Sequence, residues 1–263
     1  MNLTSPSQVK AWCIERGFHP NRTLGQNFLI DKNVLDAILD NAPYHDEKIL
    51  EIGPGLGVLT EGLLARGYKV TAIEKDPVLA DRLSEALGNP PGLTTLKGDA
   101  LDFIKSGDCD GFKTLVSNLP YQAGTRILLE LARRPEARPE SMTVLVQTEV
   151  AERLAAGPGG KTRGLAGVWI QLDYDVSCVR KVAASCFWPR PEIGSTIVRL
   201  ERHHRNDDIP ADIRDAFARI TKQAFEHRRK QLGAIFKGEI ESTARAEDLS
   251  NDEWLDLARF LSR

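Results

Sequence analysis

Short apolar runs alternate along the first two thirds of the chain with segments in which apolar residues recur at helical spacing. A short apolar run is typical of a buried strand, and the longer spacing is typical of an amphipathic helix. The runs predict five strands, at residues 48–52, 69–73, 93–97, 113–117 and 143–147. The helical spacing predicts helices at residues 31–41, 58–66, 77–87, 123–133 and 148–156. This alternation indicates a parallel sheet with crossover helices, a doubly wound, Rossmann-like α/β fold.

The pattern changes toward the C-terminus. Two further apolar runs, at 169–176 and 196–201, follow each other without a strong helix between them and predict an antiparallel hairpin that finishes the sheet. After a polar stretch at 203–210, only helical spacing is found. We therefore predict two domains: an α/β domain of residues 1–204 and a small all-helical domain of residues 205–263.

Composition narrows the classes of protein to consider. The 263 residues, 41% of them hydrophobic, suffice for one substantial domain and a small appendage. No apolar run approaches the ~18–20 residues that cross a bilayer, and the first residues lack the pattern of a signal peptide. The four cysteines are scattered, which disfavours a zinc site or a disulfide framework. We expect a cytoplasmic protein with no membrane segment and no metal.

The charge does not by itself indicate a nucleic-acid partner. The net charge is −2, whereas nucleic-acid-binding domains are usually basic. Phosphates respond to local patches within ~8–10 Å, however, so a cluster of basic side chains still matters. Arg228, Arg229 and Lys230 form one such cluster in the predicted helical domain.

A glycine-rich loop follows the first predicted strand. Residues 51–57 read Glu-Ile-Gly-Pro-Gly-Leu-Gly, and glycines let the backbone turn sharply and approach a ligand at this edge of the sheet. A dinucleotide fingerprint needs glycine or alanine where the chain has Val58, and Pro54 removes a backbone donor that a pyrophosphate would use. The spacing therefore favours a cofactor without a pyrophosphate and disfavours a nicotinamide-dependent dehydrogenase.

Two acidic residues end the next predicted strands. Glu74 follows the second strand, where a carboxylate accepts hydrogen bonds from ribose hydroxyls. Asp99 follows the third, placed either to accept from an adenine amino group or to cap a helix. Together with the glycine loop, these acids indicate an adenosyl cofactor.

The fourth predicted strand is followed by residues 118–121, Asn-Leu-Pro-Tyr. This segment is either an ordinary turn or, at the same sheet edge, a site for a planar base that carries an exocyclic amine. The Asn118 side-chain oxygen and the Leu119 carbonyl would accept the two amine hydrogens, and Tyr121 would stack on the base. No strong general base is required for such a methyl transfer, because a sulfonium group leaves readily.

Short segments spread over most of the chain resemble one family. They are residues 24–29 (Leu-Gly-Gln-Asn-Phe-Leu), 53–57, 73–76, 98–100, 118–121, 147–151, 156–161, 187–191 and 224–230. The sequence resembles the rRNA adenine N6,N6-dimethyltransferases, the family of bacterial KsgA (RsmA) and its eukaryotic and mitochondrial relatives. The segments 118–121 and 24–29 are specific to that family, whereas the glycine loop is shared by many methyltransferases.

The resemblance implies a function and a set of site residues. It implies dimethylation of two adjacent adenosines near the 3′ end of small-subunit rRNA during ribosome biogenesis, with S-adenosylmethionine as cofactor. Nothing in the sequence demands more than a monomer. It places catalysis on Asn118, Leu119, Pro120 and Tyr121, and a second aromatic wall on Phe187, opposite Tyr121. It implies RNA contacts from the basic cluster in the helical domain. Cofactor contacts are implied for Gln26, Asn27, Leu29, Gly53, Gly55, Glu74, Lys75, Asp99, Ala100 and Asn118.

The sequence departs from the family pattern after the tetrapeptide, at residues 122–125, and at residues 191–195. These departures and the acidic charge concern the RNA footprint and leave the chemistry intact. Two alternatives therefore stay open. One is an Erm-type methyltransferase of large-subunit rRNA, and the other is a non-catalytic ribosome assembly factor that keeps the fold.

Overall fold

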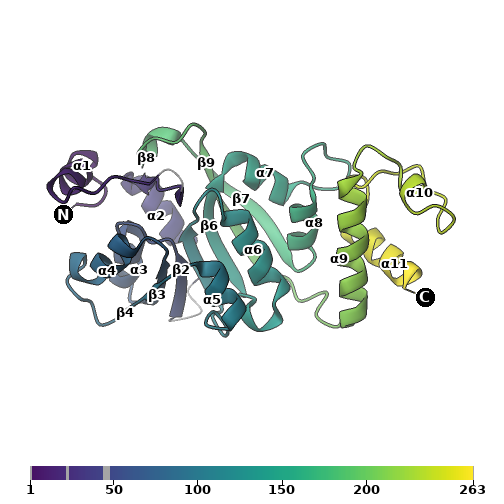
Figure 1. The fold of residues 1–263 in the computed structure, drawn as a ribbon, viewed down its shortest axis with the longest axis horizontal. Coiled ribbons are helices and arrows are strands. Elements are labelled where there is room, and N and C mark those ends of the chain that lie inside the picture. The colour runs from purple at the N-terminus through teal and green to yellow at the C-terminus, as the bar shows by residue number, and fades with distance from the viewer. Residues whose placement is uncertain (1, 22–23, 44–47, 263) are drawn as a thin grey trace. The chain divides into compact units, whose positions relative to one another are not determined.

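The computed structural model describes residues 2–21, 24–43 and 48–262 (Figure 1). Contacts within the chain divide it into two compact units. The first consists of Met1–Ala151 and Ser177–Glu201, and the second of Glu152–Val176 and Arg202–Arg263. Among the described residues, no helix is both long enough and apolar enough to cross a membrane.

The centre of the first unit is a seven-stranded sheet in the order β4-β3-β2-β5-β6-β9-β7. Neighbouring strands from β4 to β6 are parallel, and β9 runs antiparallel to β6. The strand order reverses between β2 and β5, and ligands bind at the carboxyl ends of the strands at such a reversal. The predicted α/β fold is confirmed. The strands are β2 (Lys48–Ile52), β3 (Lys69–Glu74), β4 (Leu93–Lys97), β5 (Thr114–Asn118), β6 (Ser141–Gln147), β7 (Tyr174–Val182) and β9 (Ser195–Arg202).

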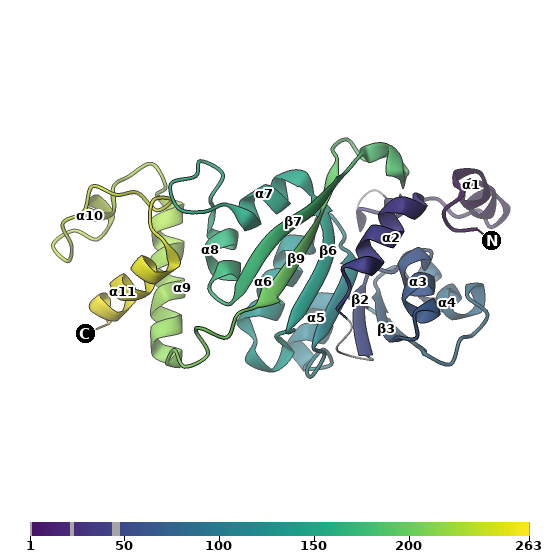
Figure 2. The same cartoon turned by 180° about the vertical axis from the view of Figure 1, so that it is seen from behind.

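Helices cover both faces of this sheet. Helices α5 and α6 lie on one face (Figure 1), and α2 lies on the other, which faces the viewer in Figure 2. Acidic side chains begin three of the helices: Asp31 caps α2, Asp76 caps α4 and Asp99 caps α5. The helices are α2 (Lys32–Asp40), α3 (Val58–Ala65), α4 (Pro77–Ala86), α5 (Ala100–Ser106), α6 (Gly124–Arg133) and α7 (Thr148–Ala155).

A helix and a small ribbon lie outside the main sheet, and neither was predicted. Helix α1 (Pro6–Glu15) precedes a two-stranded antiparallel ribbon of β1 (Phe28–Leu29) and β8 (Phe187–Trp188). A row of aromatic rings links them: Trp12 to Phe18 at 5.9 Å between centroids, Phe18 to Phe28 at 6.3 Å, and Phe28 to Trp188 at 6.5 Å. Short 3-10 turns occur at Pro135–Ala137 and Ala184–Cys186.

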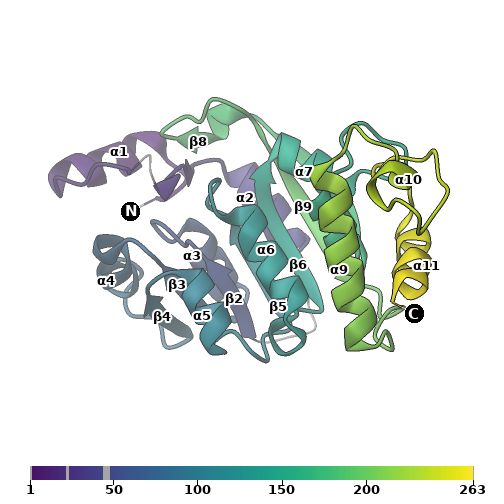
Figure 3. The same ribbon diagram turned by 45° about the vertical axis from the view of Figure 1, so that its right-hand side comes forward.

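The second unit is helical. Its elements include α8 (Leu165–Gln171), α9 (Ala211–Glu226), α10 (Leu232–Ile235) and α11 (Asn251–Leu261), and α11 packs along α9 (Figure 3). Phe217, Ile220 and Trp254 are fully buried in its core. Ser250 and Glu253 form a capping box that begins α11.

The structure corrects the prediction at residues 169–176. The predicted strand is wrong at residues 169–171, which belong to α8, and is confirmed only from Tyr174, where β7 begins beside β9. A short apolar run does not distinguish a buried helix from a strand, and burial of Val168, Ile170 and Leu172 accounts for the apolar run.

Residues 152–176 group with the C-terminal helices, so the helical unit is larger than the predicted domain of residues 205–263. Buried Arg163 is one reason, because its guanidinium donates to the Ala156 carbonyl (2.9 Å) and to Asn251 Oδ1 (3.0 Å). Trp169 Nε1 likewise donates to Thr221 Oγ1 at 2.9 Å.

Candidate active site

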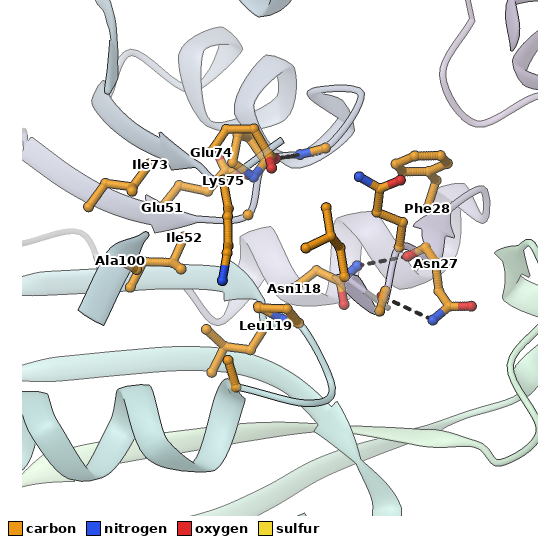
Figure 4. A pocket seen from close by; sticks show the side chains of 18 of the residues that line it. Asn27, Phe28, Glu51, Ile52, Ile73, Glu74, Lys75, Ala100, Asn118 and Leu119 are labelled. Atoms are coloured by element: carbon orange, nitrogen blue, oxygen red, sulfur yellow. Dashed lines mark hydrogen bonds between the residues drawn. The ribbon is translucent and has the colours of Figure 1, made fainter. Parts of the chain in front are cut away.

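A pocket opens at the carboxyl ends of β2, β3, β4 and β5 (Figure 4). The Asn-Leu-Pro-Tyr segment 118–121 lines it together with every residue predicted to contact a cofactor. Those residues are Gln26, Asn27, Leu29, Gly53, Gly55, Glu74, Lys75, Asp99, Ala100 and Asn118. Segments far apart in sequence therefore converge at one point of the fold, the point where the strand order reverses.

The glycine loop brings its backbone close to two other pocket walls. Gly53 has a φ of +71°, and a Cβ there would lie 3.5 Å from the Pro120 ring. Gly55 has a φ of +60°, and a Cβ there would lie 3.1 Å from the Phe28 ring. A side chain at either position would be strained, and at Gly55 it would also press on Phe28. The loop therefore exposes backbone to the pocket.

Glu74 ends β3 and faces this loop. Its Oε2 accepts from the Gly55 N–H at 3.0 Å and its Oε1 from the Asp76 N–H at 2.8 Å. Burial raises the pKa of Glu74, against the lowering effect of these two backbone donors. Each carboxylate oxygen has a second lone pair, so Glu74 is oriented to accept from two neighbouring hydroxyls such as those of a ribose.

Asp99 both caps a helix and faces the pocket. Its Oδ1 accepts from the Leu101 N–H at 2.9 Å, and its Oδ2 accepts from Lys75 Nζ at 2.7 Å. The Lys75 ammonium holds the pKa of Asp99 below its usual value. Figure 4 shows Lys75 extending into the space between Ala100 and Asn118. The carboxylate is therefore kept charged at the edge of the pocket, as an acceptor for an amino group.

Asn118 carries an unused hydrogen-bond acceptor. Its Nδ2 donates to the Asn27 carbonyl at 3.3 Å, shown as a dashed line in Figure 4. Its Oδ1 is buried and has no hydrogen-bond partner among the described residues. An unsatisfied buried acceptor costs about 1–3 kcal/mol. Such a cost is typical of a site at which a ligand supplies the missing donor.

Tyr121 lines the same pocket, and its hydroxyl is hydrogen-bonded. The Tyr121 Oη lies 2.7 Å from Ser195 Oγ. Burial raises the pKa of Tyr121, so the phenol stays protonated at neutral pH. A pocket lined by both an aromatic ring and an unpartnered amide oxygen suits a planar base with an exocyclic amine.

Phe187 does not line this pocket, contrary to its predicted role as the second aromatic wall. The side chain is 2% exposed and belongs to the hydrophobic core, with Phe187 opposite Leu29 in the β1–β8 ribbon. Its place in the ribbon turns the ring into the core, where it offers no free face to a base.

Leu3 and Glu51 are among the pocket residues that were not found from the sequence. Leu3 reaches the pocket from the segment before α1, where nothing in the sequence signals a ligand. Glu51 lies in β2 directly before the glycine loop, is 1% exposed, and accepts from Thr60 Oγ1 at 2.7 Å. Burial raises the pKa of Glu51 to about 8. The sequence signal that could have identified Glu51 as a pocket residue is an acidic side chain inside an otherwise apolar strand.

The basic cluster of Arg228, Arg229 and Lys230 lies in the helical unit. Arg228 is tied down, with its Nε 3.3 Å from Glu247 Oε2 and a terminal nitrogen donating to the Lys161 carbonyl. Arg229 and Lys230 are exposed. Arg228 therefore has a structural role in its unit, and the two exposed side chains are the ones free to meet a phosphate.

Comparisons with known protein families and sequences lead to enzymes that methylate ribosomal RNA. The family described as ribosomal RNA adenine dimethylase matches residues 17–261. The protein named Ribosomal RNA small subunit methyltransferase A of Deinococcus radiodurans is 40% identical over 231 residues, covering 88% of this chain and 76% of that protein. The protein of the same name from Chlamydia felis is 33% identical and covers 100% of this chain and 97% of its own length.

Two solved structures share the fold. A dimethyladenosine transferase from Plasmodium falciparum has a TM-score of 0.74 at 22% identity, covering 86% of this chain and 94% of that one. The 23S rRNA methyltransferase ErmE has a TM-score of 0.68 at 23% identity, covering 90% of this chain and all of that one. The family match spans both the pocket and the helical unit, and the chain belongs to the ribosomal RNA adenine dimethylase family.

Proposed function

We propose that this protein methylates N6 of two adjacent adenosines near the 3′ end of small-subunit rRNA during ribosome biogenesis. The observation that carries this proposal is the buried, unpartnered Oδ1 of Asn118 in a pocket that Tyr121 also lines. An exocyclic amine supplies the donor that this oxygen lacks. The choice of the small subunit rests on the relatives named Ribosomal RNA small subunit methyltransferase A.

The pocket residues suit S-adenosylmethionine, the cofactor of this family. When bound, it supplies an electrophilic methyl group on a sulfonium that leaves readily. Glu74 would accept hydrogen bonds from the ribose hydroxyls. Asp99 would accept from the adenine amino group through Oδ2, the oxygen that accepts from Lys75 Nζ in this structure. The glycine loop leaves room for backbone contact along the cofactor.

Asn118 and Leu119 then act on the target amine. The amine lone pair is conjugated with the ring, so it attacks poorly. In the first transfer, Asn118 Oδ1 and the Leu119 carbonyl accept the two amine hydrogens, so that the nitrogen gains tetrahedral character and its lone pair turns toward the methyl donor. The methylated nitrogen then loses one proton to solvent, and the second transfer uses the one N–H that remains. Leu119 is held for this role by its own N–H, which donates to the Leu145 carbonyl at 3.2 Å. Positioning of this kind contributes up to ~7–11 kcal/mol.

The target adenosine reaches the pocket by flipping out of the RNA, since a base inside a helix cannot present its amine to a buried site. Tyr121 stacks on the flipped base, a contact worth ~1–3 kcal/mol. Arg229 and Lys230 contact phosphates from the helical unit. The protein acts as a monomer.

The test is methyl transfer from labelled S-adenosylmethionine to small-subunit particles that lack the 3′-terminal adenine methylation, with large-subunit RNA alongside. The proposal predicts label in N6,N6-dimethyladenosine of the small-subunit particle only. Label only in large-subunit RNA would assign the protein to the Erm type. Cofactor binding without label in either RNA would indicate a non-catalytic assembly factor.

A further inference from the structure

One hydrogen bond joins the pocket tyrosine to a strand that lies much later in the sequence. Tyr121 Oη and Ser195 Oγ are 2.7 Å apart. We propose that Ser195 is a positioning residue, which holds the Tyr121 ring in the orientation that stacks on the target adenine. This inference rests on the proposed function, because it requires Tyr121 to contact the base.

Ser195 is itself held firmly. It begins β9, lies opposite Gln147 of β6 in the strand register, and is completely buried. The residue before it is fixed as well, since the Gly194 carbonyl accepts from the Thr148 N–H at 3.1 Å. A Cβ on Gly194 would lie 3.0 Å from the Val182 carbonyl oxygen, so this turn packs tightly. The Ser195 hydroxyl is therefore a fixed point rather than a mobile surface group.

The other end of the Tyr121 side chain is also fixed. The segment 118–121 is tied to β6 by the bond from the Leu119 N–H to the Leu145 carbonyl. The loop before β1 packs closely against this segment, because a Cβ on Gly25 would lie 3.3 Å from the Tyr121 nitrogen. The backbone of Tyr121 is therefore held at the end of β5 and its hydroxyl is held by β9, so the side chain spans the intervening strand β6.

This arrangement explains how a turn segment presents a ring of fixed orientation. A stacking contact depends on the plane of the ring, and a tyrosine ring without a partner for its hydroxyl turns about two side-chain torsions. Burial raises the pKa of Tyr121, so its hydroxyl stays protonated and the bond to Ser195 persists through neutral pH. The hydroxyl therefore stays available at neutral pH as the group that positions the ring.

A double-mutant cycle on the full-length protein tests this role. The variants are Tyr121→Phe, Ser195→Ala and both together, and each removes only hydroxyl groups. Ser141→Ala is the matched control, since Ser141 Oγ donates to Glu201 Oε1 at 2.7 Å across the other end of the same β6–β9 pair. For each variant, kcat on small-subunit particles, Kd for S-adenosylmethionine and the thermal unfolding midpoint are measured.

The proposal predicts that each single variant lowers kcat about five- to tenfold while Kd for the cofactor stays within about twofold. The double variant loses no more activity than either single one, because both changes break the same bond. Its stability recovers relative to the single variants, since no buried hydroxyl is left unpaired, but its activity does not. Ser141→Ala loses stability and keeps its kcat.

Three results would overturn the proposal. They are a kcat above half of the wild-type value in Tyr121→Phe, losses in the two single variants that multiply in the double one, or activity that follows the unfolding midpoint across the whole set. An inactive wild-type protein would instead contradict the proposed function, so the two failures are distinguishable.

Discussion

Replacing Glu51 by glutamine should make stability less dependent on pH. Glu51 is 1% exposed, and burial raises its pKa to about 8 from an ordinary value of 4.5. Below pH 4.5, the folded and the unfolded chain both hold the proton. Between pH 4.5 and pH 8, only the folded chain holds it, so the free energy of unfolding falls as the pH rises. Above pH 8 the loss is complete.

The size of the effect follows from the separation between the two pKa values. At pH 7 the unfolded chain has lost a proton that the folded chain keeps, which lowers the free energy of unfolding by about 3 kcal/mol relative to an uncharged isostere. Glutamine has the shape of glutamic acid and keeps an oxygen to accept from Thr60 Oγ1. Glu51→Gln should therefore raise the unfolding midpoint by several degrees at pH 7 and leave it nearly unchanged at pH 4.5.

Thermal unfolding of the variant and the wild type at pH 4.5, 6, 7 and 8 measures this directly. Glu61→Gln, which removes an exposed acid from α3 next to Thr60, controls for the loss of one negative charge. A gain from Glu51→Gln that stays constant across this pH range would refute the reasoning. So would destabilisation at pH 7, because the glutamine would then lack a partner that the protonated acid has.

Three further predictions test other residues of the pocket and the exposed part of the basic cluster. Asp99→Ala should weaken binding of S-adenosylmethionine by at least about tenfold and cost about 1 kcal/mol of stability, because it removes the cap of α5, whereas Lys75→Met breaks only a half-exposed ion pair and should change stability by less than ~1 kcal/mol. Calorimetric titration measures the affinity and thermal melts measure the stability; equal stability losses in the two variants would contradict the capping role of Asp99. Gly53→Ala should weaken cofactor binding, because Gly53 has a positive φ and its Cβ would approach Pro120; unchanged affinity would mean that the loop does not touch the cofactor. Changing Arg229 and Lys230 together to Ala should weaken RNA binding and flatten its salt dependence without altering cofactor affinity; an unchanged salt slope in a filter-binding assay would remove these side chains from the RNA contact.

Periodicity predicted the sheet well because the parallel strands are buried. The strands at 48–52 and 93–97 have the predicted limits, and the carboxyl ends of these strands carry the pocket acids. Parallel strands meet at one edge of the sheet, so residues that follow successive strands are brought together by topology alone. For that reason Glu74, Asp99 and Asn118 were predicted to converge, and all three line one pocket.

The remaining features depend on contacts that leave no periodic signal. The two-residue strands β1 and β8 are too short to show alternation, and their pairing joins residues 28 and 188. The apolar run of α8 resembles a strand until its hydrogen bonds to the C-terminal helices are known. Phe187 was assigned by resemblance, and only the ribbon shows that its ring is turned into the core.

In the proposed reaction, the unpartnered amide oxygen of Asn118 activates the target amine. The most direct test of this role is the single-turnover rate of methyl transfer to unmethylated small-subunit particles by the wild-type protein and by Asn118→Ala, with cofactor affinity and unfolding measured in parallel. Asn118→Ala should stay folded and lose more than about nine tenths of the rate, a barrier increase above ~1.4 kcal/mol. A folded Asn118→Ala variant that retains more than about a tenth of the rate would contradict this role.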